Sequence, residues 1–204
     1  MKKKHYARLM MLALSMLVLL PAYGQAPSAG SANPATSPIK GRYDLDIDYS
    51  ARIEKISGLP SSSAFVLSGV SLEGVYHLPK SPWSIAANAT GETASNIQPG
   101  VNINQIFLSA GPRYTLPAKQ KFSFYGQSLL GLVYAFNGTF PSANGTLSTA
   151  KSFGFQAGGG VNYVLTPRFG VRLLEVDYML SKLPNGDKDL QTGARFSSGL
   201  VVHF

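Results

Sequence analysis

Cysteine is absent from the 204-residue sequence, and histidine is scarce. Without cysteine the chain cannot form disulfides, thiolate metal sites or a lipid anchor on an N-terminal cysteine, and it has no cysteine nucleophile. Only His77 and His203 lie beyond the first 24 residues, whereas a metal site usually gathers several His, Cys or carboxylate ligands. We therefore expect no metal and no cofactor, and a fold held together by packing and backbone pairing.

Apolar runs long enough for a membrane-spanning helix are also lacking. The apolar run at residues 9–20 has 12 residues, fewer than the about 20 that a helical span needs. It follows a basic start and precedes the small residues Ala22 and Gly24, the layout of a secretory signal peptide cut before Gln25. Removing residues 1–24 takes away four of the 18 basic residues and none of the 10 acidic ones. The formal net charge then falls from +8 to +4, so a nucleic-acid partner is not expected.

After the signal peptide, the sequence predicts a tether followed by one domain. Residues 25–41 are rich in Pro, Ala, Ser and Gly and have too few apolar side chains to fold alone, so we predict a flexible segment. Residues 42–204 have the length of a single domain. They contain no apolar run of 18 or more, which excludes a helical membrane span within them.

Strict alternation of apolar and polar residues marks both ends of this domain. At its start Tyr43, Leu45, Ile47 and Tyr49 alternate with Asp44, Asp46, Asp48 and Ser50, and residues 195–204 repeat the pattern. A period of two is typical of a β-strand with one apolar and one polar face. Six more strands are predicted between these two, at about residues 65–78, 83–91, 103–116, 122–135, 152–165 and 169–182.

The connections between these strands are of two kinds. Three are short and carry a proline, at Pro79, Pro117 and Pro167, where proline ends a ladder. Four are longer and rich in Gly, Ser and Asn, at about residues 53–64, 92–102, 136–151 and 183–193. Short turns on one side and longer loops on the other are typical of outer-membrane barrels. The predicted fold is all-β, an eight-stranded antiparallel up-and-down transmembrane β-barrel.

Alternation alone does not separate a membrane barrel from a soluble one, because the two differ only in which face points inward. The signal peptide, the uneven connections and the aromatic C-terminal residue favour the membrane barrel. Aromatic residues also gather at the strand ends beside the short turns, where a girdle at the lipid headgroup level is expected. They are Tyr43, Tyr76, Trp83, Tyr114, Phe122, Phe124, Tyr163 and Phe204.

The polar face then lines the barrel interior, which in an eight-stranded barrel is filled by side chains. The charged candidates are Asp48, Glu73, Arg113, Glu175, Asp177 and Arg195. Because a lone buried charge is costly, we predict the pairs Asp48 with Arg195 and Glu73 with Arg113.

Arg172 has the opposite parity from Glu175 and Asp177. A β-bulge near Leu173 and Leu174 would turn all three charges inward. Without a bulge, Arg172 would extend to the short-turn rim. The sequence leaves both arrangements open and favours the bulge.

The terminal strand GARFSSGLVVHF resembles that of the outer membrane protein A-like family of small barrels, which includes the opacity-type adhesins, and the resemblance covers residues 42–204. The segments FSFYGQSLLGLVYAF and SFGFQAGGGVNYVL are similar to glycine-rich strands of such barrels. The resemblance implies that Phe204 is an assembly signal read by the barrel-assembly machinery. Since no peptidoglycan-binding domain follows Phe204, anchoring to the cell wall is not expected.

The resemblance also implies a non-enzymatic protein of the bacterial outer membrane that stabilises the membrane or adheres through its loops. No histidine lies near the long-loop rim, where a lipid-modifying enzyme would need one beside a serine, so no catalytic site is predicted. The expected partners are outer-membrane lipids, lipopolysaccharide and a surface ligand, bound by a monomer. The best contact site is loop 136–151, which carries Phe136, Phe140 and Leu147. A narrow porin-like channel and a soluble periplasmic ligand-binding barrel remain alternatives.

Overall fold

The structure is a computed structural model that describes residues 42–56, 64–98, 101–116, 121–142, 145–184 and 189–204. The predicted signal peptide, residues 1–24, and the predicted tether, residues 25–41, lie outside the described residues. None of the described residues forms an apolar helix long enough to cross a membrane.

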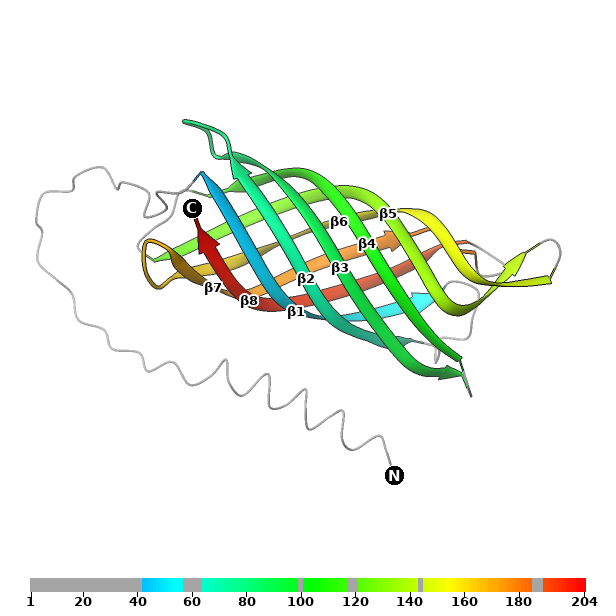
Figure 1. Ribbon diagram of the computed structural model, residues 1–204. Helices are drawn as coiled ribbons and strands as arrows, with labels where there is room; N and C mark the ends of the chain where they lie inside the picture. The colour runs from blue at the N-terminus through cyan, green and yellow to red at the C-terminus, as the bar shows by residue number, and fades with distance from the viewer. Residues whose placement is uncertain (1–41, 57–63, 99–100, 117–120, 143–144, 185–188) are drawn as a thin grey trace, which may run out of the picture. The chain divides into compact units, whose positions relative to one another are not determined.

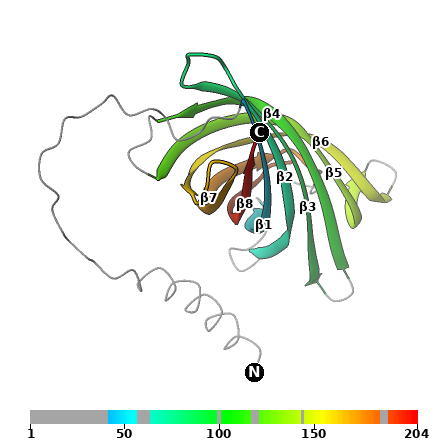
Figure 2. The same cartoon turned by 60° about the vertical axis from the view of Figure 1, so that its left-hand side comes forward.

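Eight strands form a closed antiparallel barrel in which each strand pairs with the next and β8 pairs with β1. Their order around the barrel is their order in the chain, and both views place β8 beside β1 (Figures 1 and 2). The predicted fold class is therefore confirmed. The strands are β1 Tyr43–Ile56, β2 Phe65–His77, β3 Trp83–Gln98, β4 Val101–Thr115, β5 Phe122–Ser142, β6 Gly145–Val164, β7 Phe169–Ser181 and β8 Gln191–His203.

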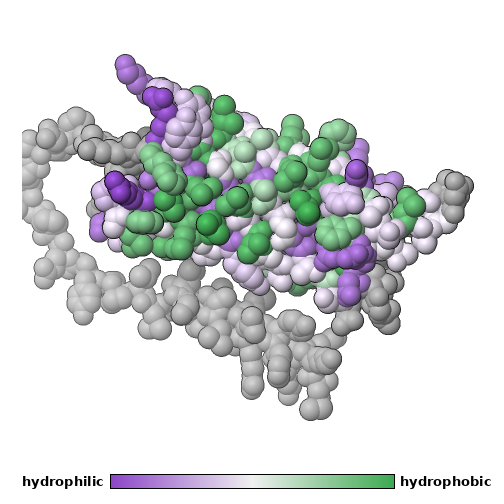
Figure 3. Space-filling view, viewed as in Figure 1, coloured by the Kyte–Doolittle hydropathy of each residue, from purple (hydrophilic) through white to green (hydrophobic). Residues whose placement is uncertain are grey.

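The apolar face of the strands points outward and the polar face inward. On β8, Leu200 is 61% exposed whereas Ser197 is 3% exposed. On β1, Ile47 and Tyr49 are exposed while Asp48 between them is buried. Apolar side chains accordingly cover the middle of the outer wall, between more polar ends (Figure 3). This arrangement is that of a membrane barrel.

The strands on the loop side are longer than predicted. Residues 92–98 belong to β3, and residues 136–142 and 145–151 belong to β5 and β6, so the predicted loops 92–102 and 136–151 are largely strand. The prediction was wrong because it assigned a strand only where alternate residues form an apolar face. Beyond the membrane a strand needs no such face, and its ladder of backbone hydrogen bonds continues through polar residues.

The β-bulge expected near Leu173 and Leu174 is present. The register of β7 shifts between Arg172 and Glu175 against β8, and between Val161 and Asn162 on the β6 side. Leu173 and Leu174 are both exposed, and Arg172 is fully buried. The extra residue therefore brings Arg172 into the interior.

At the short-turn end the barrel is closed by backbone hydrogen bonds between its first and last strands. The Arg42 amide donates to the Phe204 carbonyl at 2.7 Å, and the Phe204 amide donates to the Tyr43 carbonyl at 2.8 Å. Three aromatic pairs of the predicted girdle are in contact there, with ring centroids 5.0 to 5.1 Å apart: Tyr43 with Tyr76, Trp83 with Tyr114, and Phe122 with Tyr163.

Candidate functional site

The barrel interior holds most of the charge of the domain. Eight carboxylic residues and four arginines are buried there, and the six interior charges named from the sequence are among them. They are Asp44, Asp46, Asp48, Glu54, Glu73, Glu92, Glu175 and Asp177, together with Arg52, Arg113, Arg172 and Arg195.

Arg172 is the centre of this group. Its guanidinium donates hydrogen bonds to Asp48 at 2.7 Å and to Glu73 at 2.8 Å. It also donates to Asp46 and lies 3.1 Å from a carboxylate oxygen of Glu175. One arginine, brought inward by the bulge, thus joins carboxylates from β1, β2 and β7.

Arg113 is the second cation of the centre, and it donates to Glu73, the partner expected from the sequence. The Tyr125 ring packs against both arginines, with its centroid 4.0 Å from the Arg113 guanidinium carbon and 5.3 Å from that of Arg172. The Tyr125 hydroxyl donates to Glu175. An aromatic ring in contact with two guanidiniums favours their close approach through cation–π attraction.

The glycine run at residues 158–160 makes this packing possible. A Cβ atom on Gly160 would lie 2.6 Å from the Tyr125 hydroxyl oxygen, and one on Gly158 would lie 2.1 Å from the Val176 carbonyl oxygen. Larger residues would therefore push Tyr125 away from the arginines or push β6 and β7 apart. The run serves close strand packing, as glycine in a strand often does.

Arg195 does not pair with Asp48, so that predicted pair is wrong. Arg195 instead lies 2.8 Å from Asp177 and 3.2 Å from Glu175, both on the neighbouring strand β7. The reason is the register of the β1 and β8 seam, which sets Arg195 opposite Arg52, four residues along β1 from Asp48. Asp48 is bound by Arg172 instead.

A second charged group toward the loop side was missed. Arg52 lies 2.9 Å from Glu92 and 3.1 Å from Glu54, and it donates to Gln105. The sequence carried a signal for it, because Arg52 and Glu54 continue the inward parity of Asp48 along β1. The prediction of loops at residues 53–64 and 92–102 left Glu54 and Glu92 outside the interior, whereas Glu54 lies in β1 and Glu92 in β3, and both are buried.

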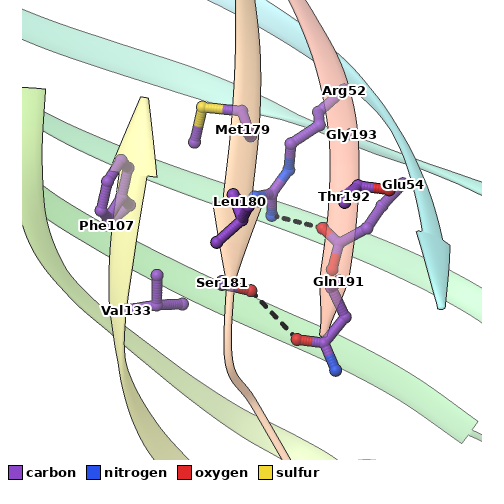
Figure 4. Close-up of a pocket in the computed structure, with 10 residues that line it drawn as sticks. All are labelled: Arg52, Glu54, Phe107, Val133, Met179, Leu180, Ser181, Gln191, Thr192 and Gly193. Atoms are coloured by element: carbon purple, nitrogen blue, oxygen red, sulfur yellow. Dashed lines mark hydrogen bonds and ion pairs between the residues drawn. The ribbon is translucent and has the colours of Figure 1, made fainter. Parts of the chain in front are cut away.

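A cavity of about 10 Å³ lies beside Arg52 and Glu54 (Figure 4). It has room for about one water molecule. Apolar side chains of Phe107, Val133 and Met179 line it from other strands (Figure 4). These three belong to a buried hydrophobic cluster near the loop-side ends of the strands. The interior is therefore filled by charged side chains and, toward the loop side, by this hydrophobic cluster.

The two histidines among the described residues lie at the short-turn end and contact the same carboxylate. His77 Nε2 is 2.7 Å from one oxygen of Asp44, and His203 Nδ1 is 2.7 Å from the other. The Ser84 hydroxyl lies 2.9 Å from His77 Nδ1. Within the described residues, no group of three His, Cys, Asp or Glu side chains is arranged to hold a metal ion.

Ser84, His77 and Asp44 thus follow the order of a hydrolase triad. Ser84 is only 2% exposed, so a substrate does not reach its hydroxyl. Asp44 also accepts the His203 contact, which ties the first and last strands together. The group closes the short-turn end of the barrel.

The loop-side end offers an accessible surface, the β5–β6 hairpin. The register of β4 with β5 ends at the pair of Asn104 with Phe136, and that of β6 with β7 ends at the pair of Gly154 with Ser181. Beyond these pairs the hairpin runs past its neighbours (Figure 1). Within the described residues, the register pairs residues 145–147 and 149–153 with β5 alone.

The apolar residues of the predicted contact loop point to different sides. Phe140 is buried in the hydrophobic cluster and is not available to a partner, whereas Leu147 is 55% exposed. The register of β5 shifts between Phe136 and Phe140, where Asn137 adopts a left-handed φ of 59°. This irregularity bends the hairpin so that Phe140 covers the interior.

Comparisons with known proteins agree with this architecture. The family model of the outer membrane protein beta-barrel domain matches residues 13–204. None of the curated proteins compared with the chain is a match.

Among solved structures, Neisserial surface protein A is similar, with 19% identity and a TM-score of 0.60 over 79% of this chain and 97% of that chain. The attachment invasion locus protein Ail of Yersinia pestis is also similar, with 18% identity and a TM-score of 0.53 over 81% of this chain and 100% of that chain. At these identities the likeness concerns the fold. Because the family model spans every described strand, the chain belongs to the outer membrane protein β-barrel family.

Proposed function

We propose that this outer-membrane barrel is a non-enzymatic surface-interaction protein that acts through its loop-side end in the manner of an adhesin. The observation that carries the proposal is the β5–β6 hairpin, which extends beyond the ladders of β4 and β7. In barrels of this class the longer connections face the cell exterior. A projecting ribbon with unpaired edges offers both side chains and backbone groups to a partner.

The outward side chains near this hairpin favour an acidic or sulfated partner. Lys151 lies on the hairpin, and the Lys182 amide donates to Ser152 at 2.8 Å, beside Lys151. Both lysines are exposed, and Phe153, two residues after Lys151, is 79% exposed. Ail has been crystallised in complex with the heparin analogue sucrose octasulfate, so a barrel of the same fold binds a sulfated sugar.

The test is the binding of fluorescently labelled heparin to intact cells that express the chain. The double substitution Lys151→Gln with Lys182→Gln is expected to weaken the affinity for the label roughly thirtyfold at low salt, since each lysine contributes about 1 kcal/mol to binding an anionic surface. The matched control, Lys80→Gln with Lys121→Gln, removes two exposed lysines from the short-turn end and should leave binding unchanged. Wild-type cells that bind no more label than cells without the chain would refute the proposal, as would equal losses in both variants.

The alternatives are less well supported. A porin-like channel needs a continuous opening, but ionic and apolar side chains fill the interior, and the cavity at their boundary measures only about 10 Å³. A soluble ligand-binding barrel would bury its apolar face, whereas Leu130, Leu200 and many other apolar side chains are exposed on the outer wall.

Phe204 is proposed to be the assembly signal of the barrel. It ends the chain beside β1, its side chain is exposed, and its backbone belongs to the closing ladder. Replacing Phe204 with Asp should leave secretion intact but reduce the amount of folded barrel in the outer membrane severalfold, because an added charge at the membrane rim disfavours insertion of the last strand. Heat-dependent mobility of membrane fractions in gel electrophoresis measures this amount. Insertion at the wild-type level would contradict the assignment.

A further inference from the structure

The outer wall of the barrel has an apolar hollow of about 700 Å³ across the middle of β2 to β5. Its floor consists of small residues that lie side by side, because Gly74 pairs with Ala87 and Ala87 pairs with Ala110. Leucines stand along its sides, namely Leu72, Leu108 and Leu130. We call this depression the mid-wall hollow.

A second hollow of about 530 Å³, here the rim hollow, lies beside it toward the short turns. Its walls are aromatic, with Trp83 and Tyr114 in edge-to-face contact at 5.0 Å and Phe124 on the next strand. Pro112 belongs to the rim hollow and Ala110 to the mid-wall hollow. Because Ala110 and Pro112 are successive outward residues of β4, the two hollows adjoin along this strand.

The exposed charges on the described part of the short-turn end are of one sign. Lys80 lies in the turn that leads into Trp83. Lys121 directly precedes β5, with its ammonium 5.9 Å from the ring centroid of Tyr163 on β6. Both lysines are exposed. The other exposed charges on the described part of the short-turn end, Arg42 and Arg168, are also positive.

We propose that the wall formed by β3, β4 and β5 is a binding site for one anionic phospholipid. An acyl chain lies in the mid-wall hollow, where the small residues permit close contact with the backbone of the sheet and the leucines flank it. The aromatic rings of the rim hollow lie at the glycerol level, as aromatic residues do at membrane interfaces. The phosphate is attracted by Lys80 and Lys121. The site depends on the membrane-spanning barrel but not on the loop-side function proposed above, so either can fail without the other.

Native mass spectrometry of the purified chain in detergent, titrated with phosphatidylglycerol and separately with phosphatidylcholine, tests this proposal. The wild-type chain is expected to retain one phosphatidylglycerol molecule as a discrete 1:1 adduct. The double substitution Ala87→Leu with Ala110→Leu places larger side chains on the floor of the mid-wall hollow. It should weaken the affinity for phosphatidylglycerol roughly tenfold, since the new side chains displace about two methylene groups of the lipid. Both alanines are exposed on the outer face, so the substitution adds no volume to the interior.

Two further variants separate the lipid site from a general effect on the barrel. The double substitution Lys80→Gln with Lys121→Gln should abolish the preference for phosphatidylglycerol over phosphatidylcholine. It should weaken the binding of phosphatidylglycerol roughly fivefold or more, because the anionic headgroup loses the attraction of two positive charges. Ala194→Leu adds the same side chain to β8, away from the hollows, and should change nothing. Heat-dependent gel mobility verifies that each variant is folded.

Three outcomes would overturn the proposal. The first is a statistical ladder of lipid adducts with no favoured 1:1 species. The second is an equal loss of binding in the Ala194→Leu control. The third is a dimer of the chain that disappears in the Ala87→Leu, Ala110→Leu variant, which would assign the hollows to a second copy.

Discussion

Replacing Arg172 with leucine is expected to lower the free energy of unfolding by about 3 to 5 kcal/mol, the usual cost of removing one partner from a buried ion pair. Arg172 is the shared partner of Asp46, Asp48, Glu73 and Glu175. Without it, these carboxylates remain buried close together with less compensating charge, and their mutual repulsion adds to the desolvation cost.

Urea unfolding of the barrel in phospholipid vesicles measures this effect, and Trp83, the only tryptophan, reports it through its fluorescence. Arg168→Leu is the matched control, because Arg168 is exposed in the turn before β7. Arg172→Lys keeps the charge but not the several hydrogen bonds, so its loss should lie between those of the other two variants. An Arg172→Leu loss no larger than that of Arg168→Leu would mean that the interior network contributes nothing to stability.

Replacing Leu200 with arginine is expected to lower the free energy of unfolding in vesicles by about 2 to 4 kcal/mol, as an arginine near the middle of the lipid-facing wall does in such barrels. Leu200 is exposed, and its lateral neighbours Ile47 and Val171 face outward with it. An arginine there would meet hydrocarbon, and its charge is too far from the rim to reach water without cost.

Leu147→Arg is the control for this substitution, since it makes the same change at an exposed leucine of the projecting hairpin. There the new charge would lie in water, and the expected loss is close to zero. Equal losses for the two variants would place Leu200 outside the hydrocarbon. A larger loss for Leu147 would put the hairpin in the membrane and contradict the loop-side assignment.

Much of the fold could be predicted from local patterns. The alternation around Asp44 to Ser50 and along residues 195–204 identified the first and last strands and the direction of their side chains. The prolines after the second, fourth and sixth predicted strands marked the short connections, because proline has no backbone N–H to donate to a ladder. These signals depend on a few neighbouring residues, and the tertiary structure did not override them.

The pairing of the interior charges could be predicted only in part: the pair of Glu73 with Arg113 is present, whereas that of Asp48 with Arg195 is not. Asp48 pairs with Arg172 rather than Arg195, since the register of the barrel seam sets the level of each inward residue. This register follows from the stagger of all eight strands together. The inward position of Arg172 further depended on one bulge, for which the sequence gave only a conflict of parity.

The structure of the loop-side surface is the other feature that could not be predicted from the sequence. Residues 136–151 are polar and rich in small residues, which is equally typical of a loop and of a strand surrounded by water. Only the pairing of β5 with β6 reveals a hairpin that turns Phe140 inward and leaves Leu147 outside. A hydrogen bond from the Lys182 amide to the Ser152 hydroxyl then places Lys182 beside the residue that follows Lys151.

The most direct test of the membrane-barrel account is an accessibility scan of β8 with a nitroxide spin label. Because the chain has no cysteine, single cysteines introduced one at a time from Phe196 to Val202 each carry one label. The collision rate of the label with oxygen, which concentrates in hydrocarbon, should alternate with a period of two in lipid vesicles. For a membrane barrel we expect maxima at Phe196, Ser198, Leu200 and Val202. Maxima at Ser197, Gly199 and Val201 would mean that the apolar face lines the interior, and would contradict the account.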